Sequence, residues 1–342
     1  MKRETIGLAL AFLWLASSCV SYKKFSVEVY KPADYGISKD AKKIALVSRN
    51  LKYTTDTLQH YQVRNHHLIK DKVRFNSDSI AVRICLDSLS AKLIARNMFD
   101  SVWVVPVNAI SVLRTNEIRP AKAGWYNTLG EKTSADVLIM LDMFSCFYNQ
   151  NNEGSGTSAN VVTSNIWSIY DVKASKLVDR YSQVDTLYWD SYDENGRYSG
   201  IKIPDKINAV SLAAGVIGEN YSKHILPDWI KVDRNYLIIN QPEFQKAIEL
   251  AQKDRWDEAS IIWQKQLTYS SKQKKIVALY NLALASEMNG DITKAIAFTD
   301  EAAKLSSGVF MASLNEAVRK YSVVLHQRRN EINKLNLQNE MH

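Results

Sequence analysis

The chain has 342 residues, of which 46% are hydrophobic and 23% charged, and its formal net charge is +8. This length predicts about two domains, and the composition is that of a folded soluble protein. Twelve glycines and six prolines exclude collagen-like and low-complexity chains, and three cysteines without a CxxC pair exclude a disulfide scaffold or a zinc ribbon.

The positive charge is spread thinly along the chain. Its densest clusters are Lys272 with Lys274 and Lys275, and the pairs Lys23–Lys24 and Arg328–Arg329. A nucleic-acid-binding protein concentrates basic residues on one stripe, usually with aromatic residues between them. Mild, dispersed basicity instead indicates a solvated surface, so we expect no nucleic-acid partner.

The N-terminus has the features of a secretory signal. Lys2 and Arg3 precede the apolar run 5–16, which is too short to span a bilayer. The sequence Ser17-Ser18-Cys19 that follows resembles the lipobox of bacterial lipoproteins, in which the cysteine is lipidated and becomes the first residue of the mature protein. The alternatives are an ordinary signal peptide with an incidental cysteine and a short uncleaved anchor.

The lipobox resemblance implies that residues 1–18 are a signal peptide and that an acylated Cys19 holds the protein in a lipid bilayer. No later stretch approaches 18 apolar residues. Val20, which is not an aspartate, favours the outer membrane of a Gram-negative envelope, with the protein facing the periplasm. This compartment permits a disulfide between Cys85 and Cys146. Both cysteines have apolar neighbours, however, which favours buried free thiols.

Residues 19–40 are predicted to be an anchor and tether that leads into an α/β domain spanning about residues 25–235. The order of its elements is β-α-β-α-β-β-β-α, a mixed sheet with helices, in an α/β sandwich. The expected strands are 42–48, 101–107, 135–148, 165–172 and 177–189, and the expected helices are 79–96, 122–132 and 208–225. The first helix carries one apolar face, formed by Val82, Leu86, Leu89 and Leu93.

Four phrases in and after these elements resemble an uncharacterised lipoprotein family of Bacteroidota-type envelopes. They are KKIALVSRN, SADVLIMLDMF, NIWSIYDVKASKLVDRYSQVDTLYW and HILPDWIKVDRNYL. The resemblance covers nearly the whole mature chain and implies C-terminal tetratricopeptide repeats. A more distant similarity links the pattern to α/β domains of curli-secretion lipoproteins and of outer-membrane activators of peptidoglycan synthases, as an analogy of fold that carries no function.

Residues 241–330 contain an internal repeat. Four positions of the first unit correspond to positions 36 residues later, and three of the four pairs keep small or large apolar character. The tetratricopeptide period is about 34, and a two-residue loop extension explains the difference. The first unit carries Ala247, Trp256, Ala259 and Trp263, and the second carries Leu282, Ala283, Gly290, Ile292, Ala295 and Ala302 at signature positions. Small alanines allow two helices to approach closely, glycine permits a left-handed helix end, and Asp291 caps the next helix.

A third helix at about 309–327 has no signature partner, so we interpret it as a capping helix, followed by a polar tail at 331–342. A plain helical bundle is the alternative to the repeat. Trp256 and Trp263 stand at core spacings, which favours packing over binding.

Catalytic patterns are weak. His66 and His67 are adjacent, near Asp71, whereas helical metal sites use i, i+4 spacing. The cluster Asp185, Asp190, Asp193 and Glu194 does not match a calcium loop and indicates a solvated turn. A lone thiol such as Cys85 is no evidence of a nucleophile. We therefore expect no catalytic residue, metal or cofactor.

These features predict a membrane-anchored envelope lipoprotein that acts without catalysis, as a scaffold or assembly factor that binds an envelope protein through its helical repeats. One alternative is an envelope hydrolase with a catalytic α/β domain. The other, by the analogy of fold, is a regulator of cell-wall synthesis or secretion.

Overall fold

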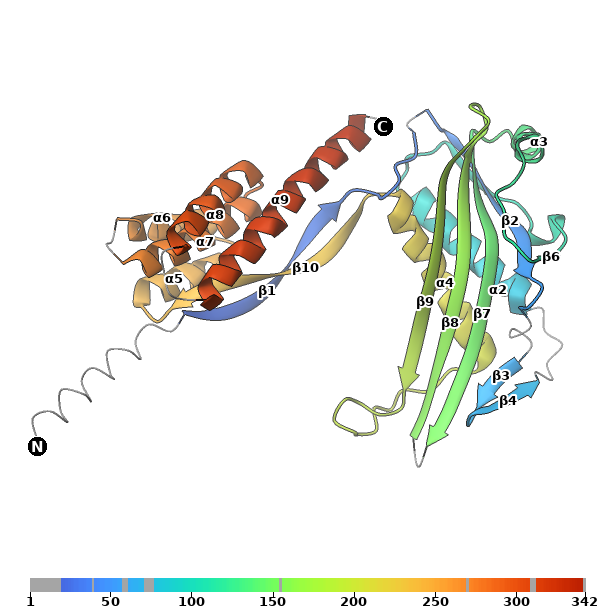
Figure 1. The fold of residues 1–342 in the computed structure, drawn as a ribbon, viewed down its shortest axis with the longest axis horizontal. Coiled ribbons are helices and arrows are strands. Elements are labelled where there is room, and N and C mark those ends of the chain that lie inside the picture. Colours follow the sequence, from blue (N-terminus) through green and yellow to red (C-terminus); the bar gives the residue numbers. More distant parts are fainter. Residues whose placement is uncertain are drawn as a thin grey trace, which may run out of the picture. The chain divides into compact units, whose positions relative to one another are not determined.

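The computed structural model describes residues 20–38, 40–56, 61–70, 77–153, 156–268, 271–307 and 312–340 (Figure 1). The predicted signal peptide, Cys19 and Asp71 lie outside the described residues. The chain forms two compact units. Residues 33–227 are called the sheet unit here, and residues 20–32 together with 228–338 are called the helical unit.

The sheet unit contains one eight-stranded mixed sheet. Its strands are β2 (Lys43–Tyr53), β3 (Tyr61–Arg64), β4 (His67–Lys70), β5 (Ser101–Val104), β6 (Leu113–Thr115), β7 (Val137–Glu153), β8 (Gly156–Asp171) and β9 (Lys176–Asp190). The long strand β7 pairs antiparallel with β8 on one side, and on the other it pairs parallel with β2 and, further along, with β3. β2 in turn pairs parallel with both β5 and β6.

Helices cover both faces of this sheet. α2 (Ser77–Ala95) and α4 (Lys206–Ile225) pack against each other along one face, and α3 (Ala123–Thr133) lies on the other (Figure 1). Ile139 and Leu141 of β7 point into the core under α2 and α4, while Leu138 and Met140 point to the α3 side. This alternation follows from the two-residue period of a strand, and it explains why the sequence of β7 is apolar at successive positions.

The fold class expected from the sequence, a mixed sheet with helices followed by C-terminal helices, is confirmed. The predicted face of α2 is buried throughout, and Cys85 and Cys146 are buried free thiols. No element was expected between the strand at 42–48 and the helix at 79–96, but β2 continues to Tyr53 and the hairpin of β3 and β4 follows it. Its two-residue turn consists of Asn65 and His66, both in the left-handed conformation. Asparagine tolerates this conformation, but the pair lacks the glycine that usually marks such a turn in a sequence.

The helical unit consists of a two-stranded ribbon and five helices. β1 (Val20–Lys31) pairs antiparallel with β10 (Asp228–Ile239) along twelve consecutive residues. The helices are α5 (Pro242–Ala251), α6 (Trp256–Gln266), α7 (Lys272–Met288), α8 (Ile292–Ser306) and α9 (Ala312–Glu340). None of the helices in the described ranges is long and apolar enough to cross a membrane.

The borders of the two units differ from those expected. Residues 20–31 are a strand rather than a tether, and they belong with β10 to the helical unit, not to an α/β domain at 25–235. The pairing joins segments about two hundred residues apart, so no local pattern in the sequence reveals it.

The predicted polar tail is also wrong, because α9 continues to Glu340. No glycine or proline interrupts residues 312–340, and the side chain of Leu335 is buried. An ion pair at i, i+3 between Arg328 and Glu331 supports this part of the helix.

Gly218 sets the distance between α4 and α2. A Cβ atom at this position would overlap the carbonyl oxygen of Cys85 and approach the amide nitrogen of Leu89 to 3.1 Å. We predict that Gly218→Ala lowers the free energy of unfolding by about 1–3 kcal/mol, because backbone atoms cannot give way as flexible side chains do.

Gly215→Ala is the matched control in the same helix. Its Cβ atom would meet the Ser88 Oγ atom at 3.5 Å, an ordinary contact, and alanine favours the helix by up to about 1 kcal/mol. Urea unfolding followed by circular dichroism measures both variants. Equal stabilities of the two would contradict the backbone contact.

Candidate functional site

The repeat residues named from the sequence all lie in two helical hairpins, α5–α6 and α7–α8. Nine of the ten are buried side chains: Ala247, Trp256, Ala259, Trp263, Leu282, Ala283, Ile292, Ala295 and Ala302. The tenth, Gly290, has a φ of 79° just after α7, and the carboxylate of Asp291 accepts a hydrogen bond from the Lys294 amide at the start of α8. Asp254, the counterpart of Gly290 in the first hairpin, is likewise left-handed, with a φ of 58°.

The tryptophans of the hairpins belong to the core. Trp263 is fully buried, and Trp256 packs against the rings of Phe25 and Tyr236 at centroid distances of 5.9 Å. Phe25 and Tyr236 stack on each other at 4.2 Å. The first helical hairpin therefore packs against the β1–β10 ribbon through aromatic rings.

Strand β10 lies along α7 and is held there by polar contacts. The Asn281 side chain pairs with the backbone of Leu237, donating to its carbonyl at 2.8 Å and accepting from its amide at 3.1 Å. Further along, the Arg234 guanidinium contacts both carboxylate oxygens of Glu287, at 2.6 and 2.9 Å. The Tyr321 hydroxyl of α9 donates to the same carboxylate at 2.6 Å, and burial with this negative charge raises the tyrosine pKa.

These contacts bear on where a partner could bind. Residues 276–287 of α7 are buried without interruption. The side of α7 that faces β10 is therefore filled by the chain itself. A partner of the helical unit can reach the outward surfaces of the other helices and of the ribbon, which include a hollow of about 390 Å³ beside Tyr22, Arg234 and Tyr321.

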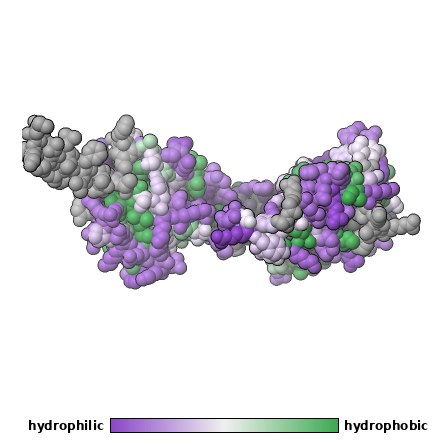
Figure 2. Space-filling view, turned by 90° about the horizontal axis from the view of Figure 1, so that it is seen from below, coloured by the Kyte–Doolittle hydropathy of each residue, from purple (hydrophilic) through white to green (hydrophobic). Residues whose placement is uncertain are grey.

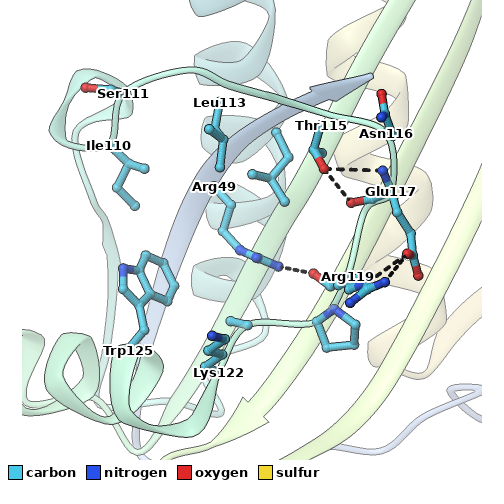
Figure 3. A pocket seen from close by; sticks show the side chains of 13 residues that line it. Arg49, Ile110, Ser111, Leu113, Thr115, Asn116, Glu117, Arg119, Lys122 and Trp125 are labelled. Atoms are coloured by element: carbon cyan, nitrogen blue, oxygen red, sulfur yellow. Dashed lines mark hydrogen bonds and ion pairs between the residues drawn. The ribbon is translucent and has the colours of Figure 1, made fainter. Parts of the chain in front are cut away.

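A second candidate site lies on the sheet unit and is called the Arg49 pocket (Figure 3). It has a volume of about 710 Å³, within the range of small-ligand sites. Its wall comes from β2, β6 and the segment that leads into α3. The lining residues are Arg49, Leu51, Ile110, Ser111, Leu113, Thr115, Asn116, Glu117, Arg119, Pro120, Ala121, Lys122 and Trp125.

A β-bulge in β2 shapes this pocket. The register of β2 with β7 shifts between Ser48 and Leu51, and Asn50 has a φ of 52°. Its side-chain amide donates to the carbonyls of Val107 and Ile110, at 2.8 and 2.6 Å, which fixes the opposite wall. Bulges re-aim side chains in this way, and here Arg49 stands beside the pocket.

Arg49 is paired with a buried carboxylate. Its Nη1 atom lies 3.0 Å from Oδ1 of Asp142, which is 0% exposed, and it also donates to the Arg119 carbonyl at 2.9 Å. The Ser168 hydroxyl donates to the other carboxylate oxygen at 2.7 Å. Burial raises the pKa of Asp142, an effect that the Arg49 charge opposes. The guanidinium also lies 5.8 Å from the ring of Trp125.

The Arg49 pocket offers a ligand both apolar surface and positive charge. Leu51, Ile110, Leu113, Pro120 and Trp125 supply apolar surface, and Arg49, Arg119 and Lys122 supply positive charge. Glu117, the one carboxylate among the lining residues, is 2.7 Å from Arg119. The lining includes no histidine or cysteine that could form a nucleophile–base pair with its hydroxyl groups.

Sequence reasoning missed the Arg49 pocket. Its residues are scattered over the chain positions 49–125, and their side chains meet because β2 pairs with β6. The one local signal is the polar pair Arg49-Asn50, which interrupts the apolar run of β2. That interruption marks the bulge.

The histidines, the acidic residues and the cysteine named from the sequence do not come together in one site. His66 lies in the β3–β4 turn and His67 begins β4, exposed. No cluster of three or more metal-binding side chains occurs in the described residues. Asp185 and Asp190 lie on β9, and the Asp193 side chain accepts hydrogen bonds within its own turn, from Asn195 and Arg197. Burial raises the pKa of the Cys85 thiol, which disfavours the reactive thiolate.

We predict that Arg49→Met destabilises the sheet unit by about 3–5 kcal/mol at about pH 7, because it leaves Asp142 buried without its counter-ion. The double variant Arg49→Met/Asp142→Asn should recover most of this loss. Because the pKa of Asp142 is raised by burial, the folded state binds a proton more readily than the unfolded chain. The deficit of the single variant therefore shrinks as the pH falls towards about 4, the usual range of aspartate. Urea unfolding at several pH values measures this, and a deficit independent of pH would contradict it.

The chain was compared with solved structures and with curated proteins. Two solved structures similar to it are a minor lipoprotein from Acinetobacter baumannii and lipoprotein GNA1162 from Neisseria meningitidis. The first is 9% identical with a TM-score of 0.26, and the match covers 54% of this chain and 90% of the other. The second is 10% identical with a TM-score of 0.23, covering 53% and 98%. No curated protein matches the chain.

Two family matches divide the chain in a way close to its two units. Residues 245–327, which span the helices from α5 into α9, match a domain of unknown function (DUF6340). Residues 41–237, more than half of the chain, match a second family. The chain belongs to this family, which is described as a domain of unknown function (DUF8603).

Proposed function

We propose that this protein is a lipoprotein of a Gram-negative envelope, anchored in the outer membrane through an acylated Cys19 and facing the periplasm. The sequence supports this through a basic start, an apolar run of signal length and two small residues before the cysteine. Val20 after the cysteine supports outer-membrane delivery. β1 begins at this same residue, so the anchor leads directly into folded chain.

We further propose that the anchored protein acts without catalysis, as a scaffold or assembly factor that binds another envelope protein through its helical hairpins. The observation that carries this is the pair of hairpins α5–α6 and α7–α8, whose repeated small residues pack inward. Their outward surface includes the exposed side chain of Ile261 on α6. Figure 2 shows one face of the molecule, where hydrophobic areas lie among hydrophilic ones.

The Arg49 pocket is a second candidate surface for the partner. Leu113 is 59% exposed and Trp125 41%, next to the cations Arg119 and Lys122. Such a surface fits an extended segment with apolar and acidic side chains. A hydrolase would need converging carboxylates or a nucleophile with a base, and the lining of this pocket favours binding instead.

The anchor is tested at Cys19. We expect Cys19→Ala to abolish processing, so that the precursor accumulates with residues 1–18 attached and without the mass of the acyl chains. Globomycin, which blocks the lipoprotein signal peptidase, should cause accumulation of the wild-type precursor. Membrane fractionation and intact-mass measurement read out both. A mature wild-type chain without acyl mass would contradict the anchor.

The binding surface is tested by cross-linking in the membrane, followed by mass spectrometry of the captured proteins. We expect Ile261→Glu to reduce capture of the partner severalfold, because it places a charge on the outward surface of the hairpins. Leu113→Glu tests the Arg49 pocket in the same way. Val184→Glu, at a 71% exposed position of β9, is the matched control. If only Leu113→Glu reduces capture, the pocket binds the partner, and the role of the hairpins is refuted.

A further inference from the structure

The start of β1 fixes which end of the helical unit lies nearest the anchor. Val20 pairs with Ile239, and α5 begins three residues later, at Pro242 (Figure 1). Cys19 immediately precedes Val20 in the sequence. A residue spans at most about 3.6 Å of chain, so an acylated Cys19 is within a few ångströms of this end. The inference that follows rests on the proposed lipidation.

The direction of α7 shows which of its residues lie at the same end. Asn281 contacts Leu237, which pairs with Tyr22, and Glu287 contacts Arg234, which pairs with Phe25. Going from Glu287 back to Asn281, and on to the start of α7, the helix therefore approaches the level of Val20. With rises of about 1.5 Å per helical residue and 3.3 Å per strand residue, the level of Val20 is reached near residue 277. Lys272 and Lys275 then lie about 3–8 Å beyond Val20, on the side of Cys19.

The other helices place further lysines at this end. The hairpins alternate in direction, so the last turns of α6 and α8 lie beside the first turn of α7. Those turns carry Lys265 and Lys304. The Tyr22 hydroxyl donates to the Ser313 carbonyl at 3.1 Å, which brings the start of α9 to the same end.

Four lysines stand at this end of the helical unit, and its exposed carboxylates include Glu243 in the first turn of α5 and Glu301 one turn before Lys304. Lys265, Lys272 and Lys304 are exposed, and Lys275 is partly exposed. In the described part of the chain, no carboxylate lies within ion-pair distance of Lys272, Lys275 or Lys304. The first turn of α7 holds no acidic residue, and lysines there oppose the helix dipole, so they cost the helix a little stability.

We propose that this end of the helical unit is a membrane-docking face. Its lysines bind the headgroups of anionic phospholipids around the acylated Cys19, and the protein is held against the bilayer with a fixed orientation. Lipid anchors commonly combine acyl chains with a basic patch, because each adds to the affinity. The lysine cluster lies close to the bilayer in this arrangement because β1 begins at Val20, the residue that follows Cys19.

The test uses a chain that starts at residue 20, which contains every residue that the structure describes and has no acyl group. We expect it to co-sediment with vesicles of phosphatidylcholine containing about one-third phosphatidylglycerol, and not with phosphatidylcholine alone. Binding should weaken strongly between about 0.05 M and 0.3 M NaCl. The triple variant Lys272→Gln/Lys275→Gln/Lys304→Gln should reduce the partition about 100-fold, at about fivefold for each lysine.

The matched control is Lys231→Gln/Lys253→Gln/Lys294→Gln. It removes the same charge from three exposed lysines of the helical unit that lie away from Val20. Equal losses in the two triple variants would overturn the proposal, as would equal binding of wild type to the two kinds of vesicle. Lipidation is measured separately, as the acyl mass on Cys19 of the full chain made in cells. A wild type with this mass but without selective vesicle binding refutes the docking face and leaves the anchor intact.

Discussion

The pairing of β1 with β10 is the constraint on which the organisation of this protein depends. Twelve residue pairs join the first described residues to a segment about two hundred positions later, so both connections to the sheet unit leave from one end of the ribbon. The ribbon cannot stand alone, because two isolated strands are marginal in water. The ribbon is attached to the helices by the contacts of Asn281 and Arg234 and by the aromatic rings around Trp256. The ribbon in turn covers one side of α7.

This arrangement changes how the repeat is understood. In the sequence, the hairpins have the character of a module added to the end of the chain. In the structure, residues 276–287 of their central helix are buried on all sides, with β10 on one of them. The small residues at repeat positions pack the helices together, as their spacing implies, but the surface left for a partner is the outward one. The same closure brings the N-terminal strand, and hence the proposed anchor, to the helices rather than to the sheet.

The sheet unit holds a buried ion pair in a mostly apolar core. Its core is apolar on both faces of β7, yet Asp142 of that strand is fully buried with Arg49 and Ser168 as partners. A buried ion pair adds little net stability compared with an apolar pair of similar size. What this pair does is hold a guanidinium in one position beside the Arg49 pocket, so the buried carboxylate fixes a positive charge at the wall of that pocket.

Local pattern was sufficient for much of this protein. Consecutive residues were enough to predict the apolar face of α2 and the strands β7, β8 and β9, because the apolar residues follow the periods of a helix and of a strand. The sequence also pointed to the repeat positions, because small and large apolar residues stand 36 residues apart, and nine of the ten named residues have buried side chains. The proposed lipidation of Cys19 rests on sequence alone. Tertiary structure decided the partner of residues 20–31, the Arg49 pocket and the end of the helical unit to which Cys19 leads, because each depends on contacts between segments far apart in the chain.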